Sequence, residues 1–235
     1  MRFCRGYIQL MKTLTLVALS SAALASVSAA QVTTIDEGSF TITVNGARAG
    51  REDFRIRSTP GANGPEVVAT ANVSYGARRV LPQLQADSLG VPLRYVVQVK
   101  AGGAADEHVE GMVGRGRVSA SVKNSRGESA SEFVVSQRAV VIDDDVFHQY
   151  YFLTRRSPGP VSVIVPRRNA QVVMQLAEAG SEKVSIGGTS IDARHLTVTD
   201  PSGANREVWA DASGRLLKVA IPSRGIVALR DDPPR

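Results

Sequence analysis

The stretch REVWADASGRLLKVAIPSRGIVALR, residues 206–230, decides the fold class of this sequence. Two clusters of turn-forming residues, 211–214 and 222–225, divide it into three short apolar segments. In the middle segment Leu217 and Val219 share one side of an extended chain, because side chains alternate between the two faces of a strand. The stretch therefore predicts three antiparallel β-strands with one buried face and one mostly wet face.

Comparable segments recur along the chain, separated by Gly, Asn, Asp, Ser or Pro, which is typical of an antiparallel all-β domain. GSFTITVNGARAGREDFRIRS, residues 38–58, is the clearest hairpin, because Asn45-Gly46 supplies the positive-φ positions of a tight turn. The other expected strands are 66–75, 80–87, 93–100, 108–114, 118–123, 131–136, 161–165, 171–178, 183–186 and 191–199. Together they predict a single antiparallel β domain over residues 31–230, with a disordered tail at 231–235.

One segment breaks this pattern: DDDVFHQYYFLTRRS, residues 143–157. Asp144 or Asp145 can cap a helix start, and Phe147 and Tyr151 lie one helical turn apart, so the segment predicts one helix of about ten residues. A helix so aromatic must pack on something, and the concave side of a curved sheet is the natural place. The expected fold class is therefore all-β, mainly antiparallel: a strongly curved sheet or half-barrel with one short helix against its concave face. A closed sandwich is the alternative.

Residues 1–30 predict a secretory signal peptide. They contain no acidic residue, become apolar and small, and place Ser28 and Ala30 at the positions that precede a cleavage site before Gln31. Met11 is an alternative start, because the segment that follows it already has every region of a signal peptide. A membrane-spanning helix is the other interpretation, but it requires about twenty mostly apolar residues, and this run is shorter and rich in serine. We expect export, to the periplasm if the host is Gram-negative and otherwise by secretion.

Charge and cysteine content exclude several classes of function. Cleavage removes three of the 28 basic residues and none of the 22 acidic ones, so the net charge falls from +6 to +3, which is too small to favour nucleic acid as a partner. The one cysteine, Cys4, precedes the apolar run. The exported chain is therefore expected to have no disulfide, no cysteine-based site and no lipid-anchored cysteine. We expect the exported protein to be released from the membrane after cleavage and to have no integral membrane span.

No motif for catalysis or metal binding stands out, so we expect no catalytic residue, no metal and no cofactor. The acidic run 143–145 beside His148 could ligate a divalent cation, but consecutive side chains diverge, and acids favour a helix start on electrostatic grounds alone. His108 and His195 fall in expected strands at solvent-facing positions, without a motif around them. The serine-nucleophile elbow and the zinc-protease signature are absent. The chain is predicted not to be an enzyme, an unrecognised hydrolase being an alternative.

Two stretches resemble a known group of proteins. FTITVNGARAGREDFRIRS, residues 40–58, is a first hairpin with glycines in its turn region, and VSIGGTSIDARHLTVTDPSGANREVWADASGRLLKVAIP, residues 184–222, contains a Trp-x-Asp-x-x-Gly-Arg turn. They resemble exported bacterial proteins of the uncharacterised DUF3108 and DUF6134 type, which in turn look like relatives of the LolA and LolB lipoprotein carriers. The resemblance implies an incomplete barrel with an apolar concave side, which in the carriers holds acyl chains. This chain departs from the carriers in showing one expected helix instead of several.

The expected sheet and helix predict where an apolar ligand would lie. One short helix covers too little area to seal a many-stranded sheet, so we expect an apolar groove between them. Its expected lining residues are Val97, Phe147, Tyr151, Trp209, Leu217 and Val219. The sequence thus predicts a non-enzymatic envelope protein that binds a lipid or another apolar molecule. The alternatives are a structural or interaction domain with an envelope protein as partner and no small ligand, and a closed core in which these side chains pack on one another.

Overall fold

The computed structural model describes residues 31–235 except 102–103, 115–116, 125–126, 135 and 137. The predicted signal peptide, residues 1–30, lies outside the described residues. The first half of the sheet contains β1 (Thr33–Val44), β2 (Ala47–Gly61), β3 (Gly64–Tyr75), β4 (Arg78–Asp87), β5 (Pro92–Ala101), β6 (Ala104–Gly114), β7 (Arg117–Asn124) and β8 (Gly127–Val134). The second half contains β9 (Ala139–Val141), β10 (Gly159–Val165), β11 (Ala170–Ile186), β12 (Thr189–Thr199), β13 (Asn205–Ala210), β14 (Leu216–Ile221) and β15 (Ile226–Arg230).

These strands form one 15-stranded sheet in the order β8-β7-β6-β5-β4-β3-β2-β1-β15-β14-β13-β12-β11-β10-β9. Neighbouring strands are antiparallel, apart from β9 and β10, which run parallel. β1 joins the two halves, because it pairs with β2 on one side and with β15 on the other. In the described part of the chain the end strands β8 and β9 do not pair with each other, so the sheet stays open. The predicted fold class, all-β and mainly antiparallel, is confirmed, and the closed alternative is not adopted.

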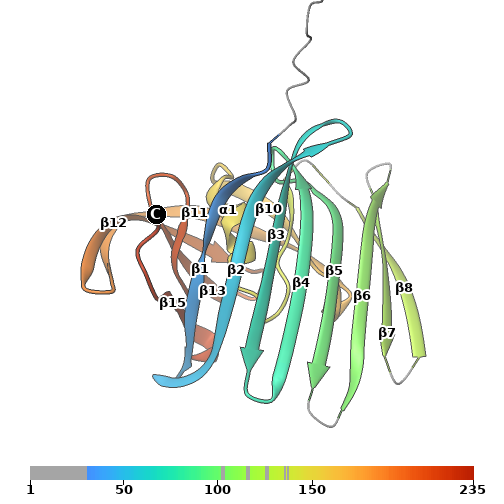
Figure 1. Ribbon diagram of the computed structural model, residues 1–235, viewed down its shortest axis with the longest axis horizontal. Helices are drawn as coiled ribbons and strands as arrows, with labels where there is room; N and C mark the ends of the chain where they lie inside the picture. The colour runs from blue at the N-terminus through green and yellow to red at the C-terminus, as the bar shows by residue number, and fades with distance from the viewer. Residues whose placement is uncertain (1–30, 102–103, 115–116, 125–126, 135, 137) are drawn as a thin grey trace, which may run out of the picture.

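The sheet is strongly curved, so that β1–β5 lie in front of the second half of the sheet, with the helical segment between them (Figure 1). β9 lies against β5 across this interior. Alternate residues from both halves fill the interior, among them Phe40, Ile56, Leu84, Val163 and Leu196, each no more than 1% exposed. The period-two pattern that predicts the strands therefore also builds the core.

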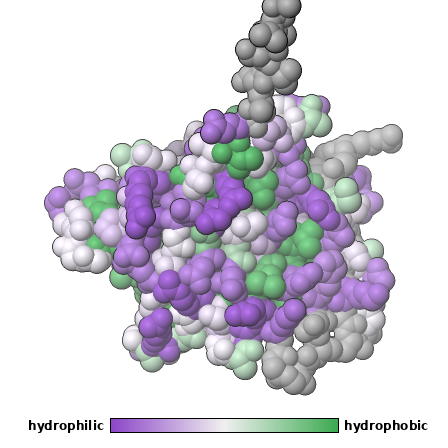
Figure 2. Space-filling view, in the orientation of Figure 1, coloured by the Kyte–Doolittle hydropathy of each residue, from purple (hydrophilic) through white to green (hydrophobic). Residues whose placement is uncertain are grey.

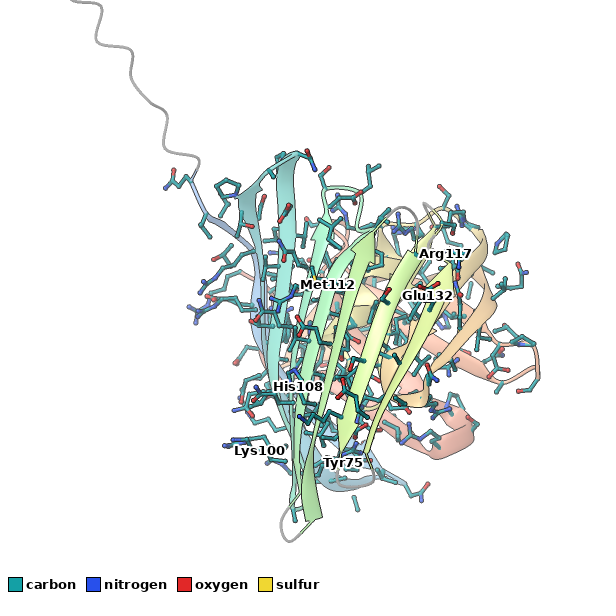
Figure 3. All side chains as sticks on the ribbon, turned by 90° about the vertical axis from the view of Figure 1, so that its right-hand side faces the viewer. Tyr75, Lys100, His108, Met112, Arg117 and Glu132 are labelled. Atoms are coloured by element: carbon teal, nitrogen blue, oxygen red, sulfur yellow. The ribbon has the colours of Figure 1, made fainter. Side chains whose placement is uncertain are left out.

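The outward face of the first half of the sheet is mostly hydrophilic, with small apolar areas between the charged side chains (Figure 2). Arg117 and Glu132 pair at 3.0 Å across β7 and β8 on the side of the molecule seen in Figure 3. On β6, His108 and Met112 lie opposite to the buried Val109, so His108 faces outward as predicted.

The helical segment is shorter than the sequence predicts. It consists of one 3₁₀ turn, η1 (His148–Tyr150), followed by one α turn, α1 (Tyr151–Thr154), and both are buried on the concave side of the sheet. Asp145 does not cap it, because its φ of 59° is left-handed and its carboxylate accepts a hydrogen bond from Arg224 at 2.7 Å. No helix among the described residues has the length and apolar character that crossing a bilayer requires.

A second apolar cluster lies on the outer face of the C-terminal strands, which corrects the prediction that this face is wet. The long hairpin of β11 and β12 bends at Gly180, where the register shifts, and its tip at Gly187 reaches Asp231 and Pro233 beside β15. The outer cluster contains Val184, Ile186, Ala193, Trp209, Leu217 and Ala220. Both faces of β13 and β14 are therefore buried, one by the interior and one by this hairpin.

The C-terminal residues 231–235 are held against the sheet, which corrects the predicted disorder. The Asp231 carboxylate accepts hydrogen bonds from the hydroxyls of Ser39 at 2.9 Å and Thr41 at 2.7 Å, and pairs with Arg51 at 2.6 Å. Partial burial opposes ionisation of Asp231, but these hydrogen bonds and the Arg51 charge outweigh it, so the pKa of Asp231 lies below its ordinary value. Local composition predicts a free tail, whereas these long-range partners fix it.

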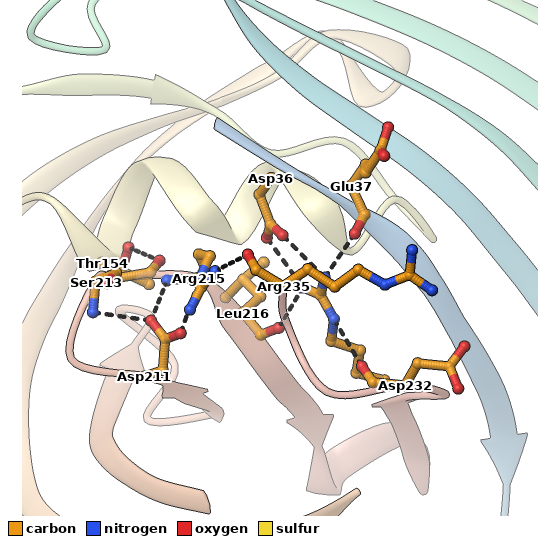
Figure 4. A network of polar contacts seen from close by, with 11 residues as sticks. Asp36, Glu37, Thr154, Asp211, Ser213, Arg215, Leu216, Asp232 and Arg235 are labelled. Atoms are coloured by element: carbon orange, nitrogen blue, oxygen red, sulfur yellow. Dashed lines mark hydrogen bonds and ion pairs between the residues drawn. The ribbon is translucent and has the colours of Figure 1, made fainter. Parts of the chain in front are cut away.

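The network in Figure 4 extends this anchoring into the sheet. Arg230, 2% exposed at its side chain, forms two hydrogen bonds with Asp36 of β1, at 2.9 and 3.0 Å. Arg230 also donates to the Asp232 carbonyl at 3.0 Å, and Arg215 donates to the Arg235 carbonyl. The end of the chain is thereby linked to β1 and β15, the two strands at which the halves of the sheet meet.

Candidate functional site

The candidate binding site is a cavity of about 180 Å³ between the segment 142–150 and the second half of the sheet. Its apolar walls consist of Ile142, Val146, Phe147, Tyr150, Val163, Val165, Met174, Val198 and Ile221. Charged side chains from the segment 143–145 and from Arg168, Asp200, Arg206 and Arg224 also border it. An engineered cavity of about 150 Å³ with apolar walls in another protein admits benzene. The cavity can therefore take one ring or a short aliphatic chain.

A buried glutamate holds the segment that forms one wall. Glu52 of β2 accepts the backbone N–H groups of Phe147 at 2.6 Å and His148 at 2.8 Å, and its carboxylate lies 2.5 Å from His148 Nδ1. Glu52 and the His148 side chain are both 0% exposed, and neither borders the cavity. The pair therefore positions the wall of the cavity.

Sequence reasoning missed Glu52, although a signal was present. Glu52, Phe54 and Ile56 share one face of β2, and the two apolar members point into the core. An acid at an inward position requires a buried partner. The sequence alone does not show which residue supplies it.

The three consecutive aspartates diverge, as predicted, and each has a different arginine as partner. Asp143 pairs with Arg167 at 2.8 Å, Asp144 with Arg168, and Asp145 with Arg224 at 2.7 Å. Across the described residues, no group of three or more potential ligands gathers in a way that could hold a metal ion.

Asp143 is the most deeply buried of the three aspartates. Its carboxylate accepts a hydrogen bond from the Tyr95 hydroxyl at 2.8 Å. Burial raises the pKa of Asp143, although the charge of Arg167 opposes this effect. Asp143 thus joins the segment to β5 and to the turn after β10.

A second, shallow groove of about 340 Å³ adjoins the cavity and shares Met174 and Arg206 with it. The groove is bordered by apolar side chains of β10 and β11, including Val165 and Val172. Arg206 Nη1 lies 3.3 Å from the Met174 sulfur, and both side chains border the cavity and the groove. A chain that is too long for the cavity can extend into the groove if Met174 changes rotamer.

The structure does not bring together the six residues predicted to line one groove. Val97, Phe147, Tyr151 and Val219 belong to the interior cluster, whereas Trp209 and Leu217 belong to the outer cluster. All six are buried, and Phe147 is the member that borders the cavity. The expectation that Trp209 and Leu217 curve around the helix is therefore wrong.

A β-bulge explains this correction. Trp209 pairs with Lys218 and Ala210 with Leu216, so the register skips Leu217 and turns its side chain to the outer face. Strict alternation of side chains would have placed Leu217 on the same face of β14 as Val219. On that outer face the Trp209 ring stacks on His195 at a centroid distance of 4.5 Å, with Lys218 Nζ 4.0 Å from the ring centroid. Trp209 is thus a packed outer-face residue.

Comparisons with known proteins support the architecture. Neither protein-family models nor curated proteins gave a match. A solved structure, the β-barrel-like protein of domain of unknown function DUF1849 from Brucella abortus, is similar with a TM-score of 0.51 at 10% identity, covering 86% of this chain and 97% of that chain. At this identity the likeness concerns the fold alone. The chain therefore has a β-barrel-like fold shared with a domain of unknown function, and the DUF3108 and LolA-type resemblance stays a prediction.

Proposed function

We propose that this protein is an exported, non-enzymatic module of the cell envelope that binds an apolar molecule, or the apolar end of a lipid, in the cavity behind the segment 142–150. The observation that carries the proposal is the cavity itself: about 180 Å³, with apolar walls from two sides and charged residues at its border. Ligand sites commonly combine an apolar concave wall with a few polar groups. The signal peptide predicted from the sequence of residues 1–30 supports the envelope location.

The size of the cavity limits the buried part of the ligand. Typical sites for drug-sized ligands measure about 300–1,000 Å³, so this cavity holds a ring or about six methylenes. Burial of six methylenes at about 0.8 kcal/mol each contributes about 5 kcal/mol before association costs. A dissociation constant of 1 mM corresponds to about 4 kcal/mol, so a short ligand binds weakly and a chain that extends into the groove binds more tightly.

Titration with octan-1-ol tests this function. Calorimetry and chemical-shift changes of cavity-lining methyl groups should show saturable binding to the chain 31–235. Val163→Phe places a larger side chain in the cavity wall and should weaken binding at least tenfold. Val173→Phe makes the same change on β11 at a residue that is 56% exposed and does not border the cavity, and it should leave binding unchanged. Equal binding by all three proteins, or no saturable binding by wild type, would refute the proposal.

A second candidate function is protein interaction through the end of the sheet. β8 is terminal and has β7 as its one neighbour in the sheet order, and an extended segment of another protein can add to such an edge through backbone hydrogen bonds. In that case hydrogen exchange of the β8 amides would slow when an envelope extract is added. Octan-1-ol would then show no saturable binding.

A further inference from the structure

Arg206 places a positive charge at the cavity that its protein partners satisfy incompletely. Among the described residues its ion-pair partner is Asp200, with Nη1 4.0 Å from the carboxylate oxygen. The other two arginines that border the cavity are paired more closely, Arg168 with Asp144 and Arg224 with Asp145 at 2.7 Å. Since a guanidinium has five N–H donors, Arg206 can donate to a further acceptor.

Asp200 is held away from Arg206 by its own turn. Asp200 Oδ1 accepts the Ser202 N–H at 2.8 Å, the Ser202 hydroxyl at 2.5 Å and the Ala204 N–H at 3.1 Å. These hydrogen bonds, that from the Ser202 hydroxyl foremost, lower the pKa of Asp200 and fix its carboxylate in the loop between β12 and β13. Asp200 therefore stays ionised, but its carboxylate lies 4.0 Å from Arg206 Nη1, too far for a hydrogen bond.

Tyr150 supplies a second donor at the same place. Tyr150 borders the cavity as Arg206 does, and the positive charge of Arg206 acts on the Tyr150 hydroxyl. Burial raises the pKa of Tyr150 to about 12, which exceeds the opposing effect of Arg206, so the phenol keeps its proton at neutral pH. The protonated hydroxyl group can therefore donate a hydrogen bond to a ligand beside Arg206.

Resting on the function proposed above, we propose that the cavity selects monocarboxylates: the ligand is an amphipathic carboxylic acid whose apolar end fills the cavity and whose carboxylate binds Arg206 and the Tyr150 hydroxyl. A carboxylate matches the planar guanidinium, which can donate two parallel hydrogen bonds to it. The neighbouring acids, the run 143–145 and Asp200, disfavour an anion of higher charge such as a phosphate monoester.

Octanoate and octan-1-ol are the matched probes, because they share a chain length and differ in charge. At neutral pH and low salt, wild type should bind octanoate about tenfold more tightly than octan-1-ol, the effect of a charge-assisted hydrogen bond. Arg206→Gln should abolish this preference, because it should weaken octanoate binding about tenfold more than octan-1-ol binding. Tyr150→Phe should reduce the preference by a smaller factor.

Arg117→Gln is the control for overall charge, because Arg117 pairs with Glu132 on β7 and β8, outside the cavity border. It should keep the full preference for octanoate. Equal binding of both probes by wild type would overturn the carboxylate proposal while the proposed function stands. Binding of neither probe would overturn both. Loss of the preference in Arg117→Gln, or equal weakening of both probes in Arg206→Gln, would also overturn the role of Arg206. If Arg206→Gln fails to fold, the wild-type comparison and Tyr150→Phe decide.

Discussion

Replacement of Glu52 by Gln tests how the segment that walls the cavity is held. The Glu52 carboxylate is 0% exposed and faces three donors: two backbone N–H groups at 2.6 and 2.8 Å and His148 Nδ1 at 2.5 Å. Glutamine keeps the shape but offers one acceptor oxygen and turns an NH₂ group toward the remaining donors. At least one buried donor therefore loses its partner.

The expected cost follows from the burial of the whole group. A hydrogen bond to a charged group contributes about 1.5–3 kcal/mol, and a buried donor left unsatisfied costs about 1–3 kcal/mol. We expect Glu52→Gln to lower the free energy of unfolding by about 3–4 kcal/mol, a large part of the about 5–15 kcal/mol of a typical domain.

Urea unfolding of the chain 31–235, followed by far-UV circular dichroism and Trp209 fluorescence, measures this cost. Glu110→Gln is the matched control, because Glu110 pairs with Arg94 at 2.5 Å on the outward face with its side chain 38% exposed. Exposed pairs contribute about 0–1 kcal/mol, so the control should stay within 1 kcal/mol of wild type. A cost for Glu52→Gln below about 1 kcal/mol would show that the segment 142–150 is held by apolar packing alone and would refute this reasoning.

Three further predictions concern the turns, the tail and the acidic run. Gly225→Ala should destabilise the protein by about 2–3 kcal/mol in thermal unfolding, and Gly46→Ala by about 1 kcal/mol. Both glycines have positive φ, but of the two only Gly225 would place a Cβ against another group, Asn45 Oδ1 at 2.0 Å. Equal costs for the two variants would contradict the role of this contact. Asp231→Asn should lower stability by about 1 kcal/mol at neutral pH. Because the folded state lowers the pKa of Asp231, this difference should be full above the ordinary carboxyl pKa and vanish as pH falls through the lowered one, and a pH-independent difference would argue against the ionic anchor. Wild type and Asp144→Ala, each purified and reconstituted with metal, should both contain no bound metal by mass spectrometry. Stoichiometric metal in wild type would contradict this prediction.

The strands could be predicted because their signals are local. Alternation and turn residues lie within a few positions of each other, so Asn45-Gly46 and the turn 211–214 identify hairpins without any long-range information. The merged strand β11 (Ala170–Ile186) and the short strand β9 (Ala139–Val141) were missed. β9 is too short to show a period, and it is a strand because β10 lies parallel to it.

The candidate site could be predicted only in part. Phe147 and the aromatic segment around it were identified from composition, and they do form one wall of the cavity. Arg206 and Tyr150 were not singled out as a pair, because they are separated by the whole of β10–β12 along the chain. The face of the sheet on which Leu217 lies was predicted wrongly. A β-bulge shifts the register by one residue, so the side chains beyond it lie on the opposite faces.

The sequence by itself determined that this chain forms antiparallel β-strands, where most of its turns lie, and that one aromatic segment interrupts them, because these properties depend on backbone preferences and on neighbours within a few residues. Only the tertiary structure decided which buried charges meet. Glu52 finds the N–H groups of Phe147 and His148 across 95 and 96 positions, and Asp36 finds Arg230 across 194. Such pairs form when the curved sheet brings distant strands together, and the high cost of burying an unpaired charge then makes them specific.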